Sequence, residues 1–195
     1  MSTLAPSTRL FEDLYLPGTH NSSTSSINIC SLPVPGTWFW LAKPISIPWS
    51  TCQQVGVYEQ LMDGIRVFDL RTCRVGKQLY VSHGFCNQPL EQVLQQEFMR
   101  FHLEHPKEVI TIFHKLDWDF ANSLKGGESE KQLEQATHNS FVHTCLGNKV
   151  YSGQTYVLGE IWRNDKAFVL LPECCQVHWF NSSKTGDLYD KAKQI

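Results

Sequence analysis

The chain has 195 residues, with 17 Lys and Arg against 19 Asp and Glu, so its net charge is -2. This balance, without a basic stripe, gives no electrostatic reason to expect a nucleic-acid partner. A hydrophobic content of 42% fits one globular domain with a sizeable core. Aromatic residues make up 12% of the chain and charged residues only 18%, which indicates that some aromatic surface faces something other than water.

The 7 cysteines form no C-x-x-C pair and show no regular spacing. This odd number, with Cys174 and Cys175 adjacent, is a poor disulfide framework and favours reduced thiols in the cytosol. Two N-x-S/T sequons, at Asn21 and Asn181, leave secretion open as an alternative. No stretch has the pattern of a signal peptide or a membrane span. We therefore expect a cytoplasmic protein that is dissolved or associated with a membrane surface.

Short apolar runs predict five strands between residues 14 and 171. In chain order they lie at residues 14–16, 65–70, 79–82, 109–113 and 167–171. Strands that alternate with helices favour parallel pairing.

Two amphipathic patterns predict helices between these strands. The first runs from about residue 89 to 105, and its apolar face holds Leu90, Val93, Leu94, Phe98 and Phe101. The second runs from about residue 130 to 146, and its apolar stripe is expected to be Leu133, Ala136, Phe141 and Cys145.

Ionisable residues stand at the ends of four successive predicted strands. They are His20 after the first, Asp69 and Arg71 at the second, His83 after the third, and His114, Lys115 and Asp117 after the fourth. This pattern is typical of a (β/α) TIM-type barrel with its site on the C-terminal face. A doubly wound sheet is the alternative, but the sequence has neither G-x-G-x-x-G nor a Walker A motif.

The strand count predicts that the barrel is incomplete. A whole barrel has eight strands, and this sequence yields about five of them. The chain ends at "DLYDKAKQI", within a helix-like pattern. We therefore expect a single domain over residues 1–195 from which the C-terminal part of the barrel is missing.

The residues at the strand ends suit cleavage of a phosphodiester without a metal. Two imidazoles across one substrate can act as base and acid, because the unperturbed pKa of histidine is about 6.5. Arg71 suits a phosphate, which a guanidinium grips through two parallel hydrogen bonds. Asp69 lies two residues earlier and points to the same side of the strand, where it can orient either Arg71 or a histidine.

Five sequence blocks resemble the X domain of phosphatidylinositol-specific phospholipase C. They cover residues 14 to about 171 in the order of the family, and they read "LPGTHNSST", "QLMDGIRVFDLR", "LYVSHG", "HPKEVITIF" and "TYVLGEIW…KAFVLL". The resemblance implies that His20 is the general base that activates the inositol 2-hydroxyl. It implies that His83 is the general acid for the diacylglycerol oxygen, and that Arg71 binds phosphate as in the bacterial, metal-independent members.

Calcium dependence is not expected, because a guanidinium stands where the calcium-dependent members carry an acidic ligand. His114 stands where a further acidic ligand is expected, so no metal site and no cofactor are predicted. The sequence departs from the bacterial members at two points. Asn21 replaces an acidic residue after the first histidine, and no carboxylate after residue 171 replaces the one that holds the base histidine. The chain as written therefore lacks an evident group to orient His20.

The remaining candidate residues have two interpretations each. Lys115 and Asp117 either contact inositol hydroxyls or form a solvated loop. The amide of Asn21 is expected to hydrogen-bond to the phosphate or to Arg71. The aromatic loop "PVPGTWFWLAKPISIPWST" either dips into a bilayer or packs over the barrel. Its proposed membrane contacts are Trp38, Phe39, Trp40, Leu41 and Trp49.

These expectations describe a peripheral phosphoric diester hydrolase that cleaves phosphatidylinositol to diacylglycerol and an inositol phosphate, cyclic at first. Its partner is the lipid at a membrane surface; the sequence gives no indication of protein partners. Two alternatives stay open: a catalytically inactive remnant that binds lipid or phosphate, and a phosphodiesterase of the glycerophosphodiesterase or sphingomyelinase D type.

Overall fold

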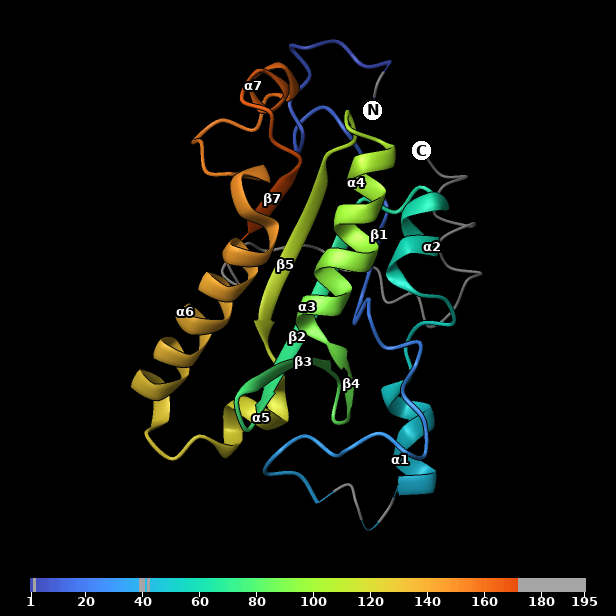
Figure 1. Cartoon of the computed structure of the whole chain (residues 1–195), viewed down its shortest axis with the longest axis vertical. Coiled ribbons are helices and arrows are strands. Elements are labelled where there is room, and N and C mark those ends of the chain that lie inside the picture. The colour runs from blue at the N-terminus through green and yellow to red at the C-terminus, as the bar shows by residue number, and fades with distance from the viewer. Residues whose placement is uncertain (2, 39–40, 42, 172–195) are drawn as a thin grey trace.

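The computed structural model describes residues 1, 3–38, 41 and 43–171. They form an α/β fold around one sheet (Figure 1). Its strands are β1 Gly18–Thr19, β2 Val67–Val75, β3 Gln78–Ser82, β4 Cys86–Pro89, β5 Ile110–Leu116, β6 Val150–Tyr151 and β7 Phe168–Leu171. Across the sheet the order is β4-β3-β2-β5-β7-β6, and β1 pairs with β2.

The helices in the described part of the chain vary widely in length. They are α1 Lys43–Ser50, α2 Val57–Met62, α3 Leu90–Gln92, the π-helical η1 Val93–Met99, α4 Arg100–Glu104, α5 Trp118–Ser123, α6 Gly127–Leu146, the 3-10 turn η2 Gly147–Lys149 and α7 Leu158–Arg163. Helices α3, η1 and α4 follow one another without a break, which confirms the helix predicted from about residue 89 to 105. Its five predicted apolar residues are all buried.

Helix α6 confirms the second predicted helix, but the predicted apolar stripe was wrong. Leu133 is 69% exposed, whereas His138, Val142 and Leu146 face the core. The buried face is offset from the predicted one because it contains a histidine, which a hydrophobic pattern does not count. Of the predicted stripe, only Phe141 and Cys145 pack against the core, and both are partly buried.

The strands differ from the prediction in number, position and direction. The strand predicted at residues 14–16 is wrong, because those residues lie in no strand and β1 begins at Gly18. The sheet of the described residues has seven strands rather than five, because β4 is polar and β6 is only two residues long. Strands β2, β3 and β4 pair in antiparallel fashion. Only Gly76 and Lys77 join β2 to β3, and so short a connection makes a hairpin. The other strand pairs are parallel, as expected for part of a barrel.

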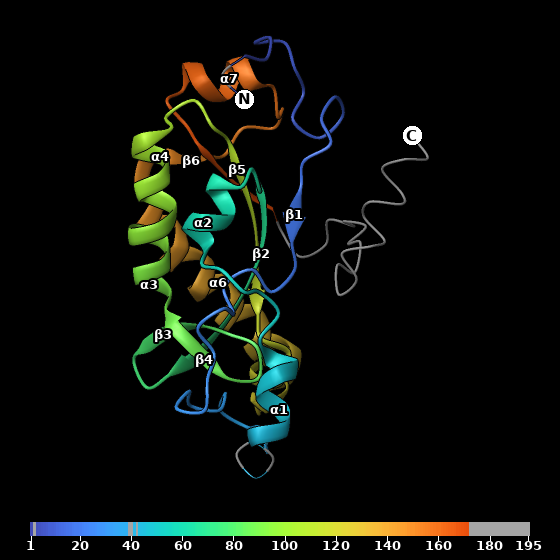
Figure 2. The ribbon, with the colours of Figure 1, turned by 90° about the vertical axis from the view of Figure 1, so that its right-hand side faces the viewer.

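Strand β2 separates the core from the site. Its residues Phe68 and Leu70 belong to the core that α2, η1, α4 and α6 build on one side of the sheet (Figure 2). The ring of Phe68 packs edge-on against Phe98 at 5.1 Å between centroids. Because side chains alternate along a strand, Asp69 and Arg71 point to the opposite face. The core thereby fixes which face of the sheet carries the ionisable residues.

The corrected face of α6 predicts unequal effects for two leucines on the same helix. Leu146→Ala removes a side chain that is 1% exposed and should lower the free energy of unfolding by about 2–5 kcal/mol. The matched control Leu133→Ala should change it by no more than about 0.5 kcal/mol. Urea denaturation followed by circular dichroism measures both. Equal losses would contradict the buried face described here.

Candidate active site

The turn after β1 places His20 beside β2. Strand β1 approaches β2 so closely that a Cβ on Gly18 would lie 2.9 Å from the Cβ of Val67. The turn is then tied to Asp69 through Ser22, whose backbone N–H donates to the Asp69 carbonyl oxygen at 2.9 Å. The Ser22 hydroxyl oxygen in return accepts the Asp69 N–H at 2.9 Å. The small polar residues of "HNSST" are therefore a buried, hydrogen-bonded turn; no helix follows that they would cap.

Asp69 is the buried centre of the site. Its Oδ2 lies 2.8 Å from Nδ1 of His20, and its side chain is 0% exposed. Burial alone would raise the pKa of this carboxyl group. The contact with His20 and the charges of Arg71 and Lys115 outweigh burial and lower the pKa to about 2. Asp69 thus stays ionised and favours the proton of His20 on Nδ1.

Arg71 lies on the other side of the same imidazole. Its Nη2 is 3.2 Å from Nε2 of His20, and its Nε and Nη2 are each 3.3 Å from Oδ2 of Asp69. A guanidinium only donates, so Nε2 accepts and carries the lone pair. Lys115 adds a second cation, with its Nζ 3.8 Å from Oδ1 of Asp69. The unprotonated nitrogen of His20 therefore faces a guanidinium group.

His83 occupies a turn after β3 that buried hydrogen bonds hold in place. The next residue, Gly84, has a φ of +69°, which favours glycine. Oδ2 of Asp117 accepts from the Ser82 hydroxyl and from the Gly84 N–H, both at 3.1 Å. Asp117 is 1% exposed, so the structure places it beneath the His83 turn rather than on a surface open to substrate.

Nδ1 of His83 has two acceptors in the segment that follows α1. The Ser50 carbonyl oxygen lies at 3.2 Å and the Cys52 sulfur at 3.5 Å. Because a carbonyl only accepts, Nδ1 carries a proton and Nε2 is the nitrogen that gains and loses the second one. Burial opposes the charged form, but the contacts with Cys52 and Ser50 raise the pKa of His83. Nδ2 of Asn21 donates to the same sulfur at 3.4 Å and so links the two histidine turns.

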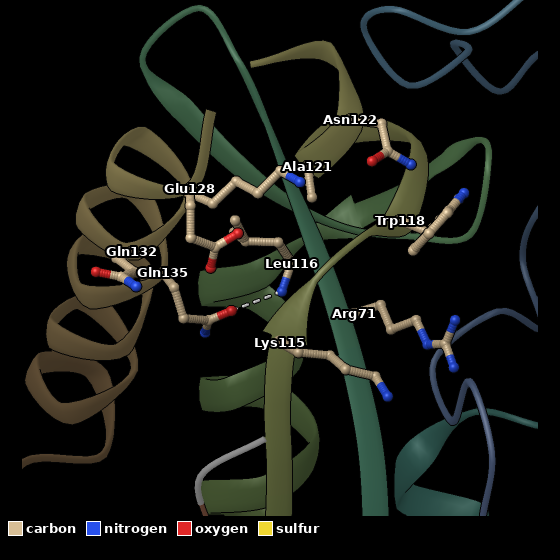
Figure 3. A pocket seen from close by; sticks show the side chains of 10 residues that line it. Arg71, Lys115, Leu116, Trp118, Ala121, Asn122, Glu128, Gln132 and Gln135 are labelled. Carbon is tan, nitrogen blue, oxygen red and sulfur yellow. Dashed lines mark hydrogen bonds between the residues drawn. The ribbon is translucent and has the colours of Figure 1, made fainter. Parts of the chain in front are cut away.

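Two cavities adjoin these groups. One, of about 490 Å³, lies between α5 and α6 and is lined by Arg71, Lys115 and Trp118 together with polar residues of α6. Figure 3 shows that Arg71 and Lys115 extend to the same side of their strands, away from α6. The other, of about 440 Å³, lies between α1 and the His83 turn and is lined partly by Ile45 and Trp49. The site is thus polar beside Arg71 and partly apolar beside His83.

His114 is not part of this cluster, contrary to the prediction that it ends a strand beside the other site residues. It lies within β5 on the face that packs against α6. Its Nε2 is 3.0 Å from the Thr72 hydroxyl, and its Nδ1 is 2.7 Å from Oδ1 of Asn139. The same hydroxyl lies 2.7 Å from Nδ1 of His138, and burial lowers the pKa of His114 to about 4. His114 therefore fastens α6 to the sheet as a neutral residue.

The aromatic segment is exposed where the structure describes it. Trp38 is 80% exposed, Leu41 64% and Trp49 81%. Phe39 and Trp40 lie outside the described residues. The second half of the segment is helix α1 rather than a loop. Trp38, Leu41 and Trp49 are therefore not buried against the rest of the described chain.

Two features are absent from the residues that the structure describes. No group of three His, Cys, Asp or Glu side chains among them converges as a metal ion would require. None of the helices in this part of the chain is long and apolar enough to cross a bilayer.

Two further residues shape the site without a signal in the sequence. Cys52 lies 31 positions before His83 and has no motif around it, so no spacing signal marks their contact. Gln60 is 3% exposed and accepts from the Thr19 hydroxyl while its amide donates to the Ser22 carbonyl. An uncharged side chain in the amphipathic helix α2 gives no sequence signal for such a role.

The sequence of the chain is similar to two proteins of Dictyostelium discoideum. A PI-PLC X-box domain-containing protein is 36% identical over 105 residues, which are 53% of this chain and 14% of that protein. A PI-PLC X domain-containing protein is 38% identical over 90 residues, 44% of this chain and 16% of its own length. The chain therefore matches only a small part of these relatives. No protein-family model matches it.

The fold is similar to that of bacterial enzymes. The phosphatidylinositol-specific phospholipase C of S. aureus matches with a TM-score of 0.59 at 20% identity, over 88% of this chain and 51% of that one. The enzyme of Listeria monocytogenes matches with a TM-score of 0.50 at 23% identity, over 89% of this chain and 55% of its own. The predicted fold class, an incomplete TIM-type barrel, is confirmed. The predicted resemblance to the PI-PLC X-domain family is confirmed by these sequence matches, and the fold agrees with it.

Proposed function

We propose that this chain carries the catalytic residues of a phospholipase C that cleaves phosphatidylinositol without a metal ion. The observation that carries the proposal is the contact series from Asp69 through His20 to Arg71. It joins a buried carboxylate, an imidazole and a guanidinium, so one nitrogen lone pair stands beside a phosphate-binding group. The names of the bacterial structural relatives, which are specific for phosphatidylinositol, support the substrate class.

His20 is the general base of the proposed reaction. Its Nε2 takes the proton of the inositol 2-hydroxyl, and the oxygen attacks phosphorus to form a cyclic phosphate. Arg71 holds the phosphate oxygens and stabilises the charge that develops on them. Asp69 keeps the Nδ1 proton in place and stabilises the imidazolium that forms. Lys115 adds positive charge on the same face, where a headgroup would bind.

His83 is the general acid. Its Nε2 gives a proton to the diacylglycerol oxygen as the bond from that oxygen to phosphorus breaks. Asp117 acts on this step as a positioning residue, since it holds the turn of His83 through Ser82 and Gly84. The cavity between α1 and His83 has an apolar wall, which suits the lipid side of the scissile bond.

Helix α1 supplies the membrane contact of the proposed enzyme. Ile45 and Trp49 are 72% and 81% exposed, and they line the cavity that His83 adjoins. Helix α1 contains no acidic residue. An exposed apolar helix beside the acid histidine would bring the site to a lipid headgroup at the bilayer surface.

A second candidate function follows from the length of the match. The match covers 51% of the S. aureus enzyme. The second candidate is therefore a protein that binds lipid or phosphate with the same residues but does not cleave the lipid. Vesicle binding without release of inositol phosphate would indicate this candidate. Release that stops in excess chelator would indicate a metal-dependent phosphodiesterase.

In excess chelator, the purified chain should release soluble inositol phosphate from phosphatidylinositol vesicles. His20→Ala and His83→Ala should each lower the rate by about 100-fold or more, because each removes one proton-transfer step. His143→Ala, an exposed histidine of α6, is the matched control and should keep the parent rate. Release that needs an added metal would contradict the proposal, and vesicle binding without release would favour the non-catalytic candidate.

Asp69→Asn should lower kcat by about 100-fold or more, because the amide no longer fixes the His20 proton on Nδ1.

The stability of the same variant should also respond differently to acid. The pKa of Asp69 is lowered from 3.8 to about 2, so the carboxylate stabilises the fold above about pH 4 and loses this effect as the pH falls through about 2. The free energy of unfolding of the parent should therefore fall more steeply between these pH values than that of the variant. Parallel curves would contradict the buried ion pair.

The double variant Ile45→Ala with Trp49→Ala should weaken binding to phosphatidylinositol-containing vesicles by about tenfold or more, since it removes apolar area that would enter the bilayer. Vesicle sedimentation measures it. The matched control is Leu103→Ala with Leu133→Ala, whose side chains are 73% and 69% exposed on other helices. Equal binding by both double variants would show that α1 is not the contact surface.

A further inference from the structure

Cys52 is a nucleophilic side chain in contact with His83, and the proposed reaction gives it no role. It is exposed and lies between α1 and α2. Its sulfur is 3.5 Å from Nδ1 of His83 and 3.4 Å from Nδ2 of Asn21. Two nitrogen donors from separate turns therefore converge on one sulfur atom.

The position of the sulfur matters because of where the protons of His83 lie. The Ser50 carbonyl oxygen, 3.2 Å from Nδ1, requires a proton on that nitrogen. The N–H is thus shared between the carbonyl and the sulfur, and the sulfur acts as an acceptor. A thiolate accepts more strongly than a thiol, and the Asn21 amide stabilises it further. A negative sulfur in turn stabilises the doubly protonated, cationic ring.

The other groups around His83 do not supply this charge as directly. Burial and the positive charge of Arg71 both oppose the protonated ring. Asp119 lines the same cavity, and Asp117 is occupied beneath the turn by Ser82 and Gly84. Cys52 is the group in contact with His83 that can become an anion. The pKa directions agree with this geometry: burial would raise the pKa of Cys52, but His83 and Asn21 lower it, and Cys52 raises that of His83.

We propose that Cys52 is a positioning residue of the general acid: as a thiolate it accepts the Nδ1 hydrogen bond of protonated His83. The thiolate–imidazolium pair keeps a proton on Nε2, the nitrogen that donates to the diacylglycerol oxygen in the proposed reaction. The part that Cys52 plays in catalysis rests on the proposed function of His83. The pair itself does not, and a measurement without any lipid can test it.

The first experiment measures the rate at which iodoacetamide alkylates Cys52 as a function of pH, by peptide mass spectrometry. The thiolate sulfur displaces iodide and forms a sulfur–carbon bond, so the rate follows the thiolate fraction. At neutral pH the parent should react about tenfold faster at Cys52 than His83→Ala does. Cys30, an exposed free thiol of the same chain, is the internal control, and its profile should be the same in both proteins. A Cys52 profile that His83→Ala leaves unchanged would overturn the proposal.

The second experiment measures kcat/KM against pH with phosphatidylinositol vesicles. The acid must be protonated, so activity falls as the pH rises through its pKa. Without the thiolate that pKa is lower, and the alkaline limb of Cys52→Ala should move by about one pH unit toward acid. Cys52→Asp restores an anion and should move the limb back, whereas Cys52→Ser should behave like Cys52→Ala. A purely structural role would lower the rate in all three variants and leave the limb in place.

The two experiments fail separately. A parent chain without turnover would sink the proposed function, while the alkylation profile still decides whether Cys52 and His83 form the pair. An active parent with an unmoved alkaline limb in Cys52→Ala would reject Cys52 as a positioning residue and leave the proposed function intact.

Discussion

The site depends on one buried charge, the carboxylate of Asp69. An ionised carboxylate without exposure to water is costly unless cations and hydrogen bonds compensate it. Here His20 from the turn after β1, Arg71 from β2 and Lys115 from β5 converge on it. The same residue anchors the His20 turn through its backbone. One carboxylate thus fixes the tautomer of the proposed base, the position of the guanidinium proposed to bind phosphate, and the path of the His20 turn.

The position of Asp69 depends in turn on the two-residue periodicity of β2. Phe68 and Leu70 are held in the core by η1 and α6, so Asp69 and Arg71 cannot leave the opposite face unless the register of the whole strand shifts. The hairpin that follows β2 carries the His83 turn back toward α1. The Asn21 amide and the Cys52 sulfur then join the two histidine turns, which makes their relative position a property of the fold.

The sequence was sufficient to predict β2, β5 and β7 and the helix that runs over α3, η1 and α4. Strongly apolar runs and the spacing of Asp69 and Arg71 carry that information locally. It did not reveal that Asp69 contacts His20, and it left the base without an evident orienting group, because a contact across 49 residues between two strands has no local pattern. The position of His114 was predicted wrongly for a related reason. Strand β5 ends at Leu116, so His114 lies inside the strand. Because side chains alternate along a strand, His114 points to the face that packs against α6.

The most direct test of this account is the protonation pattern of the His20 ring, measured by long-range ¹H–¹⁵N NMR of the imidazole at neutral pH. We expect a proton on Nδ1 and an unprotonated Nε2, and a mixture of the two tautomers in Asp69→Asn. A proton on Nε2 in the parent would contradict it, because the nitrogen beside Arg71 could then not accept the proton of a hydroxyl.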